Sequence, residues 1–169
     1  MRRFSTLYAI ALSLVFSAAA VLAQETFENA AYSLELPNAT WKATARSDNM
    51  HQHTEFVYGD RLDGHLRLRR EVVEAETTPE KLARRDEDQK LRYQNGFVGG
   101  KLMPFAGRLN GSVLAYEYTA AGKPMAGRVY YLQADPRTIY VLQFTGLRDK
   151  LLRIQNQTDA IARSFKTKQ

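Results

Sequence analysis

Apolar and polar residues alternate along several short segments of the chain, a pattern typical of half-buried β-strands. In residues 31–37, AYSLELP, every second residue is tyrosine or leucine and a proline ends the segment, which predicts a strand. Residues 53–73 alternate twice around the central sequence GDRLDG. Its glycines and aspartates favour turns, so this segment predicts a hairpin. Trp41, which lies between the two segments in a predicted turn, is interpreted as a packing residue.

The next segment is rich in charge and predicts an exposed helix over residues 79–95. Thr78 suits the N-cap position, Pro79 suits the first helical position, and Asn95-Gly96 is a suitable C-terminal stop. Acidic and basic residues recur four positions apart, which favours a solvated helix face. The apolar residues left to face a core are Leu82, Ala83, Leu91 and Tyr93.

From residue 98 onward the strand pattern returns. It predicts four strands joined by short turns, which makes an antiparallel meander. Residues 139–146, IYVLQFTG, are almost continuously apolar and predict a central strand covered on both faces. Apolar residues then recur every three or four positions, which predicts one amphipathic helix lying on the sheet. The members of this stripe are Leu147, Leu151, Ile154, Thr158, Ile161 and Phe165.

These elements predict an α+β fold: an antiparallel sheet of about six to seven strands with helices packed on its faces, an α-β-α sandwich. Residues 1–23 are set apart from it, because a basic start, an apolar stretch and Ala23 form the pattern of a signal peptide. We expect cleavage after Ala23 and a single domain over residues 24–169, secreted or periplasmic. Retention of the apolar stretch as an anchor is the alternative, although it is shorter than the roughly 20 residues of a spanning helix.

The amino-acid composition excludes several kinds of functional site. The chain has no cysteine, which excludes cysteine nucleophiles, thiolate metal sites and lipid attachment to a signal-peptide cysteine. Without Arg2 and Arg3, 22 basic and 18 acidic residues remain, a net charge of +4. Such a charge favours an envelope protein or an anionic surface component as partner, with a membrane surface as a further alternative, and does not indicate nucleic acid. After cleavage we expect no transmembrane span.

All three histidines lie in residues 49–73, and two of them, His51 and His53, form an H-x-H sequence. On a strand they share a face roughly 6.6 Å apart, so they could begin a metal site. If Tyr58 lies opposite Leu66, His53 lies opposite Glu71, which would supply the third ligand.

In the same register Glu55 lies opposite Arg69, and His65 is roughly 20 Å from Glu71, out of reach of His53. Exposed histidines beside a Glu55–Arg69 cross-strand pair account for the same residues. We therefore expect no functional metal site and no cofactor.

Arg67 and Arg69 form a basic strip on the same strand face. One interpretation is a partner-binding strip for a phospholipid headgroup, a cell-wall polymer or an acidic protein. The other, which we favour, is protection of an edge strand against aggregation. No P-loop, dinucleotide-binding or serine-hydrolase motif is present. The acidic run over residues 86–88 is expected to be solvated, so we expect no catalytic residues and no enzyme.

The chain resembles the PsbP/Mog/DcrB-like superfamily of α-β-α sandwiches, over residues 27–166. The resemblance rests on YSLELPNATWK, TTPEKLARR, AYEYTAAGKPMAGRVYYLQADPRTIYVLQFTG and the closing AIARSFK. Proteins of this kind include an extrinsic subunit of photosystem II, a Ran-binding nuclear transport factor and bacterial envelope proteins. Their shared theme is non-catalytic binding to other proteins, and no functional residues carry over. DcrB-like members are often lipoproteins. This chain has no cysteine, so it differs from them in this respect.

The resemblance and the export signal together imply a secreted, non-catalytic binding or accessory protein of the bacterial envelope, acting through protein–protein contacts. A periplasmic small-ligand carrier is the alternative, with tyrosines of the sheet as pocket lining. These are Tyr116, Tyr118, Tyr130, Tyr131 and Tyr140. A metal-binding protein that uses His51 and His53 is a third, less favoured reading.

Overall fold

The computed structural model describes residues 25–45 and 53–168. Its strands are β1 (Glu25–Glu28), β2 (Tyr32–Leu36), β3 (Trp41–Ala45), β4 (His53–Tyr58), β5 (His65–Val72), β6 (Val98–Phe105), β7 (Gly111–Ala120), β8 (Lys123–Asp135), β9 (Thr138–Leu147) and β10 (Lys166–Thr167). Seven of them form one antiparallel sheet in the order β3-β4-β5-β9-β8-β7-β6. The other three form a small sheet in the order β1-β2-β10.

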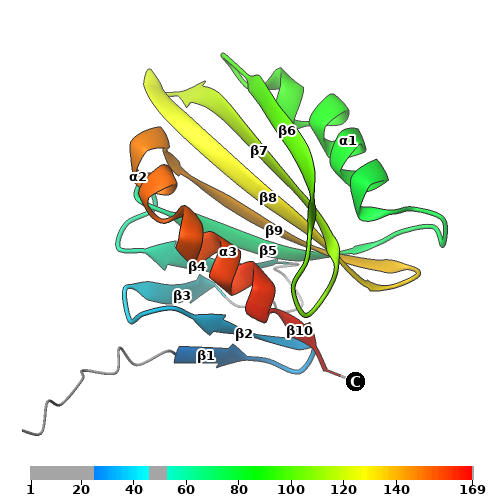
Figure 1. The fold of residues 1–169 in the computed structure, drawn as a ribbon. Helices are drawn as coiled ribbons and strands as arrows, with labels where there is room; N and C mark the ends of the chain where they lie inside the picture. Colours follow the sequence, from blue (N-terminus) through cyan, green and yellow to red (C-terminus); the bar gives the residue numbers. More distant parts are fainter. Residues whose placement is uncertain (1–24, 46–52, 169) are drawn as a thin grey trace, which may run out of the picture.

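The helices are α1 (Pro79–Gln89), the 3-10 turn η1 (Leu91–Tyr93), α2 (Arg148–Arg153) and α3 (Gln155–Ser164). Helix α1 covers one face of the large sheet, while α2, α3 and the small sheet cover the other (Figure 1). This is the predicted α+β sandwich. The predicted signal peptide, its cleavage site and His51 lie outside the described residues.

The number of strands in the main sheet agrees with the prediction, but its membership differs. Strand β2 was predicted as part of the main sheet and instead pairs with β1 and β10. Strand β3 was predicted as a turn and forms one edge of the main sheet. Only Trp41 of β3 is buried, so the strand has no alternating pattern by which it could be recognised. The Trp41 ring packs against Tyr58 and Phe144, which confirms its interpretation as a packing residue.

Helix α1 begins as predicted, because the side chain of Thr78 accepts a hydrogen bond from Lys81 N at 3.2 Å. Leu82, Ala83 and Leu91 are buried as expected. Tyr93 is 80% exposed, so its predicted place in the core is wrong. The α-helix ends at Gln89 and the chain continues through η1.

The predicted single C-terminal helix is divided into α2 and α3 at Ile154. Five of its six stripe residues are buried as predicted, namely Leu151, Ile154, Thr158, Ile161 and Phe165. Leu147 was wrongly placed in the helix, because it ends strand β9 and is half-buried. Strand β9 lies in the middle of the large sheet and its first five residues are buried, which confirms it as a central strand covered on both faces.

Two cores result, one on each face of the large sheet, and tyrosine rings fill both. Tyr130 and Tyr140 belong to the core under α2 and α3, and Tyr116 and Tyr131 belong to the core under α1. Full burial of a large apolar side chain stabilises a fold by roughly 1.5–3 kcal/mol, so packing explains these rings without a ligand. In the described part of the chain, no helix is long and apolar enough to cross a membrane.

Candidate functional site: the polar face of β4, β5 and β9

The hairpin of β4 and β5 exists as predicted, but its register differs by two residues. Phe56, instead of Tyr58, lies opposite Leu66. The loop sets this register. Tyr58 N donates to Gly64 O at 2.8 Å, so Tyr58 pairs with Gly64 instead of with Leu66. A shift of two residues keeps every side chain on its predicted face, because side chains alternate with a period of two.

The shift changes which polar groups meet. Glu55 lies opposite Arg67 instead of Arg69, and His53 lies opposite Arg69 instead of Glu71. Glu71 itself pairs in the sheet with β9, and its carboxylate lies 2.7 Å from Arg69 Nε. The predicted pairing that placed Glu71 across from His53 is therefore wrong.

His65 is also closer to His53 than the predicted register allowed, because both imidazoles contact one carboxylate. His53 Nε2 lies 3.1 Å from Glu55 Oε1, and His65 Nε2 lies 3.3 Å from Glu55 Oε2. The described residues contain no group of three or more histidine and acidic side chains that could hold a metal ion.

Glu55 is the centre of a network of ion pairs. Its side chain is only 7% exposed, and it also contacts Arg61 Nη2 at 2.5 Å and Arg67 Nη2 at 3.3 Å. Burial raises the pKa of the Glu55 carboxyl, but the charges of His65 and Arg61 and hydrogen bonds from Arg67 and His65 outweigh burial and lower that pKa to about 2. The carboxylate therefore stays ionised and is almost fully enclosed by cationic and imidazole groups.

Burial has the opposite effect on the imidazole. It lowers the pKa of His65 below its ordinary value, although the Glu55 carboxylate opposes this shift. His65 is therefore neutral at neutral pH and gains its charge only in acid.

Arg69 lies beside this network and has a different role. Its Nη2 atom lies 2.8 Å from Asp86 Oδ2 of α1, where the Asp86 side chain is only 4% exposed. Lys90 Nζ lies 2.8 Å from the other Asp86 oxygen. Asp86 was expected to be solvated, and this is wrong: it is the buried anchor by which α1 is attached to β5.

Strand β5 pairs with β4 on one side and β9 on the other. It is an interior strand, so the interpretation of Arg67 and Arg69 as edge protection is also wrong. Gln143 of β9 projects from the same face and donates to Tyr116 OH at 2.9 Å.

We call this surface the polar face. It comprises Glu55, Arg61, His65, Arg67, Arg69, Asp86, Lys90 and Gln143. Three neighbouring hollows of about 250, 320 and 400 Å³ open on it, and Arg67 and Gln143 line all three. The structure thus places both arginines of the predicted strip on a hollowed surface.

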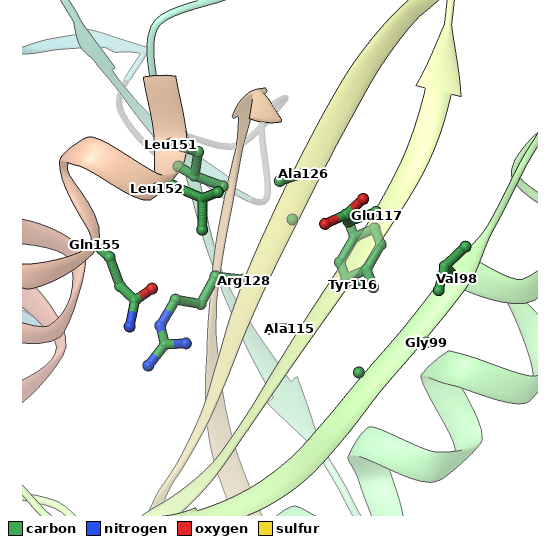
Figure 2. Close-up of a pocket in the computed structure, with 12 residues that line it drawn as sticks. Val98, Gly99, Ala115, Tyr116, Glu117, Ala126, Arg128, Leu151, Leu152 and Gln155 are labelled. Carbon is green, nitrogen blue, oxygen red and sulfur yellow. The ribbon is translucent and has the colours of Figure 1, made fainter. Parts of the chain in front are cut away.

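A different, apolar groove of about 190 Å³ lies on the other side of the sheet. Figure 2 shows Leu151 and Leu152 of α2 on one side of it and Val98 of β6 on the other, with β7 and β8 between them. The small side chains of Ala115 and Ala126 leave this part of the sheet open.

No protein-family model matches the chain, and no curated protein matches it in sequence. Solved structures do match its fold. PsbP of Synechocystis sp. PCC 6803 (CyanoP) superposes with a TM-score of 0.58 at 10% identity, covering 89% of this chain and 96% of that one. LpqN of Mycobacterium tuberculosis, described as involved in cell envelope biogenesis, gives 0.55 at 14% identity, covering 87% and 91%.

A third match is PA94 of Pseudomonas aeruginosa, a protein described as of unknown function, with a TM-score of 0.53 at 12% identity and coverage of 83% and 94%. Identities this low establish the fold alone. The chain has the PsbP-like fold, as its sequence resemblance implied.

Proposed function

We propose that this protein is a non-catalytic accessory protein of the cell envelope that binds an anionic partner through the polar face. One observation carries the proposal: Arg61 and Arg67 both contact the buried Glu55 carboxylate, yet their side chains are 60% and 48% exposed, respectively. A hollowed surface with an excess of guanidinium groups attracts anions. The description of LpqN and the predicted export signal support a place in the envelope.

The same geometry argues against catalysis at the polar face. A general base needs a pKa near the working pH. The pKa of Glu55 is about 2, so its carboxylate is a weak base near neutral pH. Asp86 borders a hollow, but both of its oxygens are paired with cations, one with Arg69 and the other with Lys90.

A small-ligand carrier has less support. The tyrosines expected to line a pocket pack mainly in the two cores, although Tyr116 borders the apolar groove, Tyr131 borders the hollow of about 250 Å³ and Tyr140 borders another of about 400 Å³. That groove, at about 190 Å³, is below the roughly 300–1,000 Å³ of ligand pockets.

Crosslinking in the native envelope, followed by mass spectrometry, tests the proposal. The informative variant is Arg61→Glu with Arg67→Glu, because both side chains are exposed, whereas Arg69 also holds α1. Arg84→Glu is the matched control, since Arg84 is 61% exposed on α1 and pairs with the exposed Glu80 at 3.1 Å. We expect one partner to be captured by the wild type and the control and lost in the double variant. Equal capture by all three proteins would refute a role for the polar face.

A further inference from the structure

One of the three hollows is lined mainly by side chains that can donate hydrogen bonds. It measures about 320 Å³ and lies between the loop after β4 and the strands β5 and β9. We call it the oxyanion hollow, and its lining residues are Arg61, His65, Arg67, Gln143 and Thr145. Two guanidinium groups, an amide and a hydroxyl therefore offer donors from three segments of the chain, whereas the neutral His65 imidazole, whose Nε2 faces Glu55, borders the hollow without adding a donor.

The buried Glu55 carboxylate holds the charged donors in place from below. Arg61 and Arg67 each contact it through one terminal nitrogen, at 2.5 and 3.3 Å. A guanidinium carries five N–H groups, so each arginine keeps further donors for a ligand. Side chains that are already ordered lose less entropy when a ligand binds, which raises affinity.

Glu55, Asp60 and Asp63 lie near the oxyanion hollow but do not line it. Glu55 offsets one of the two guanidinium groups. In the loop that carries Arg61, Asp60 accepts a hydrogen bond from Leu62 N at 2.6 Å. Asp63 lies 3.2 Å from Lys150 Nζ, which balances its charge. The lining of the oxyanion hollow itself carries two guanidinium groups and no acidic side chain.

We propose that the oxyanion hollow binds a phosphoryl group, carried by a soluble phosphate compound or by a phospholipid headgroup. One guanidinium group can donate two parallel hydrogen bonds to the two oxygens of a planar carboxylate. The oxygens of a tetrahedral phosphoryl group point in different directions, so they can accept from several donors. Gln143 and Thr145 of β9 add neutral donors opposite the arginines. This inference rests on the proposed function, in that the phosphoryl group belongs to the partner of the polar face.

The test is a titration of ¹⁵N-labelled protein with inorganic phosphate at constant ionic strength, followed by NMR. We expect saturable shifts in β5, β9 and the loop after β4. Losing one charged hydrogen bond, in Arg61→Gln, should weaken binding about tenfold, and Thr145→Val should weaken it about threefold. Thr145→Val leaves the Glu55 network intact, so it separates binding from folding. Arg84→Gln is the control and should bind as the wild type does.

Vesicles of phosphatidylcholine, with and without phosphatidylglycerol, distinguish the two sources. Sedimentation with the anionic vesicles alone, lost in Arg61→Gln, assigns a lipid headgroup. Saturable phosphate binding without vesicle binding assigns a soluble phosphate compound. A linear response to phosphate, or equal responses in Thr145→Val and the wild type, overturns the inference. If crosslinking still captures the partner after such a result, the proposed function holds, but its ligand is not a phosphoryl group.

Discussion

Replacing Glu55 by glutamine keeps the shape of the side chain and removes its charge. The structure predicts a substantial loss of stability, because the carboxylate is 7% exposed and contacts Arg61 and Arg67. The difference between its ordinary pKa of 4.5 and the folded value of about 2 corresponds to about 3 kcal/mol. Solvent around the two exposed arginines screens part of this attraction, so we expect a loss of about 2 kcal/mol at pH 7.

The pH dependence of the same variant gives a sharper test. The folded-state pKa of Glu55 is lower than its unfolded value, so its stabilisation is complete above pH 4.5 and is lost as the pH falls toward 2. The difference in unfolding free energy between the wild type and Glu55→Gln should therefore not fall between pH 7 and pH 5; it should rise as His65 gains its charge, because the Glu55 carboxylate stabilises the imidazolium. It should shrink below pH 4.5.

Urea unfolding at a series of pH values measures this difference, with unchanged m-values as the check on two-state behaviour. At fixed pH 7 the loss should also lower the melting temperature by about 4–8 °C. Glu80→Gln is the control, since the Glu80–Arg84 pair is exposed and should contribute less than about 0.5 kcal/mol. A difference that is as large at pH 3 as at pH 7 would show that the network does not stabilise the ionised carboxylate.

Two further predictions concern other parts of the structure, and a third concerns the signal peptide predicted from the sequence. Arg69→Met leaves the buried Asp86 carboxylate with one cation instead of two and should cost about 2–3 kcal/mol in urea unfolding; a loss below about 1 kcal/mol would contradict the anchoring role. Gly127→Ala places a Cβ 2.1 Å from Tyr116 Cζ and should cost about 1–3 kcal/mol in the same assay, whereas unchanged stability would contradict the packing. Protein recovered from its native host should have the mass of a chain that starts at Gln24, and an intact N-terminus would contradict export with cleavage.

The sequence predicts which face of the hairpin each residue occupies, but it does not predict the register of the two strands. Alternation fixes that Phe56 and Leu66 share the core face and that Glu55 and Arg67 share the other. Two registers that differ by two residues satisfy this pattern equally well. The loop hydrogen bond from Tyr58 to Gly64 decides between them, and the alternation does not encode it.

The parts of the polar face that sequence reasoning missed come from distant segments. Gln143 and Thr145 are predictable as strand residues, but their position beside Arg67 depends on the pairing of β5 with β9. Asp86 lies in a run of charges with regular helical spacing, so its sequence does not distinguish it from its solvated neighbours. A correct strand order would have revealed it, because an interior arginine on β5 needs an acidic partner from the covering helix.

Glu55→Gln also tests whether Glu55 orders the arginines of the oxyanion hollow for ligand binding, or whether the hollow is only a basic patch. Loss of the negative charge of Glu55 by itself favours phosphate binding, because like charges repel each other. Loss of the order imposed on Arg61 and Arg67 costs about 0.5–1.5 kcal/mol for each side chain.

A hollow that depends on preordered arginines requires the second effect to outweigh the first, and Glu55→Gln should then bind inorganic phosphate more weakly than the wild type, although it is more positively charged. A basic patch without preorganised donors predicts the opposite sign. The NMR titration measures both proteins under the same conditions, and Glu80→Gln, which removes one negative charge from α1 without touching the oxyanion hollow, controls for the change in net charge. Tighter binding by Glu55→Gln would show that charge alone attracts phosphate to this surface.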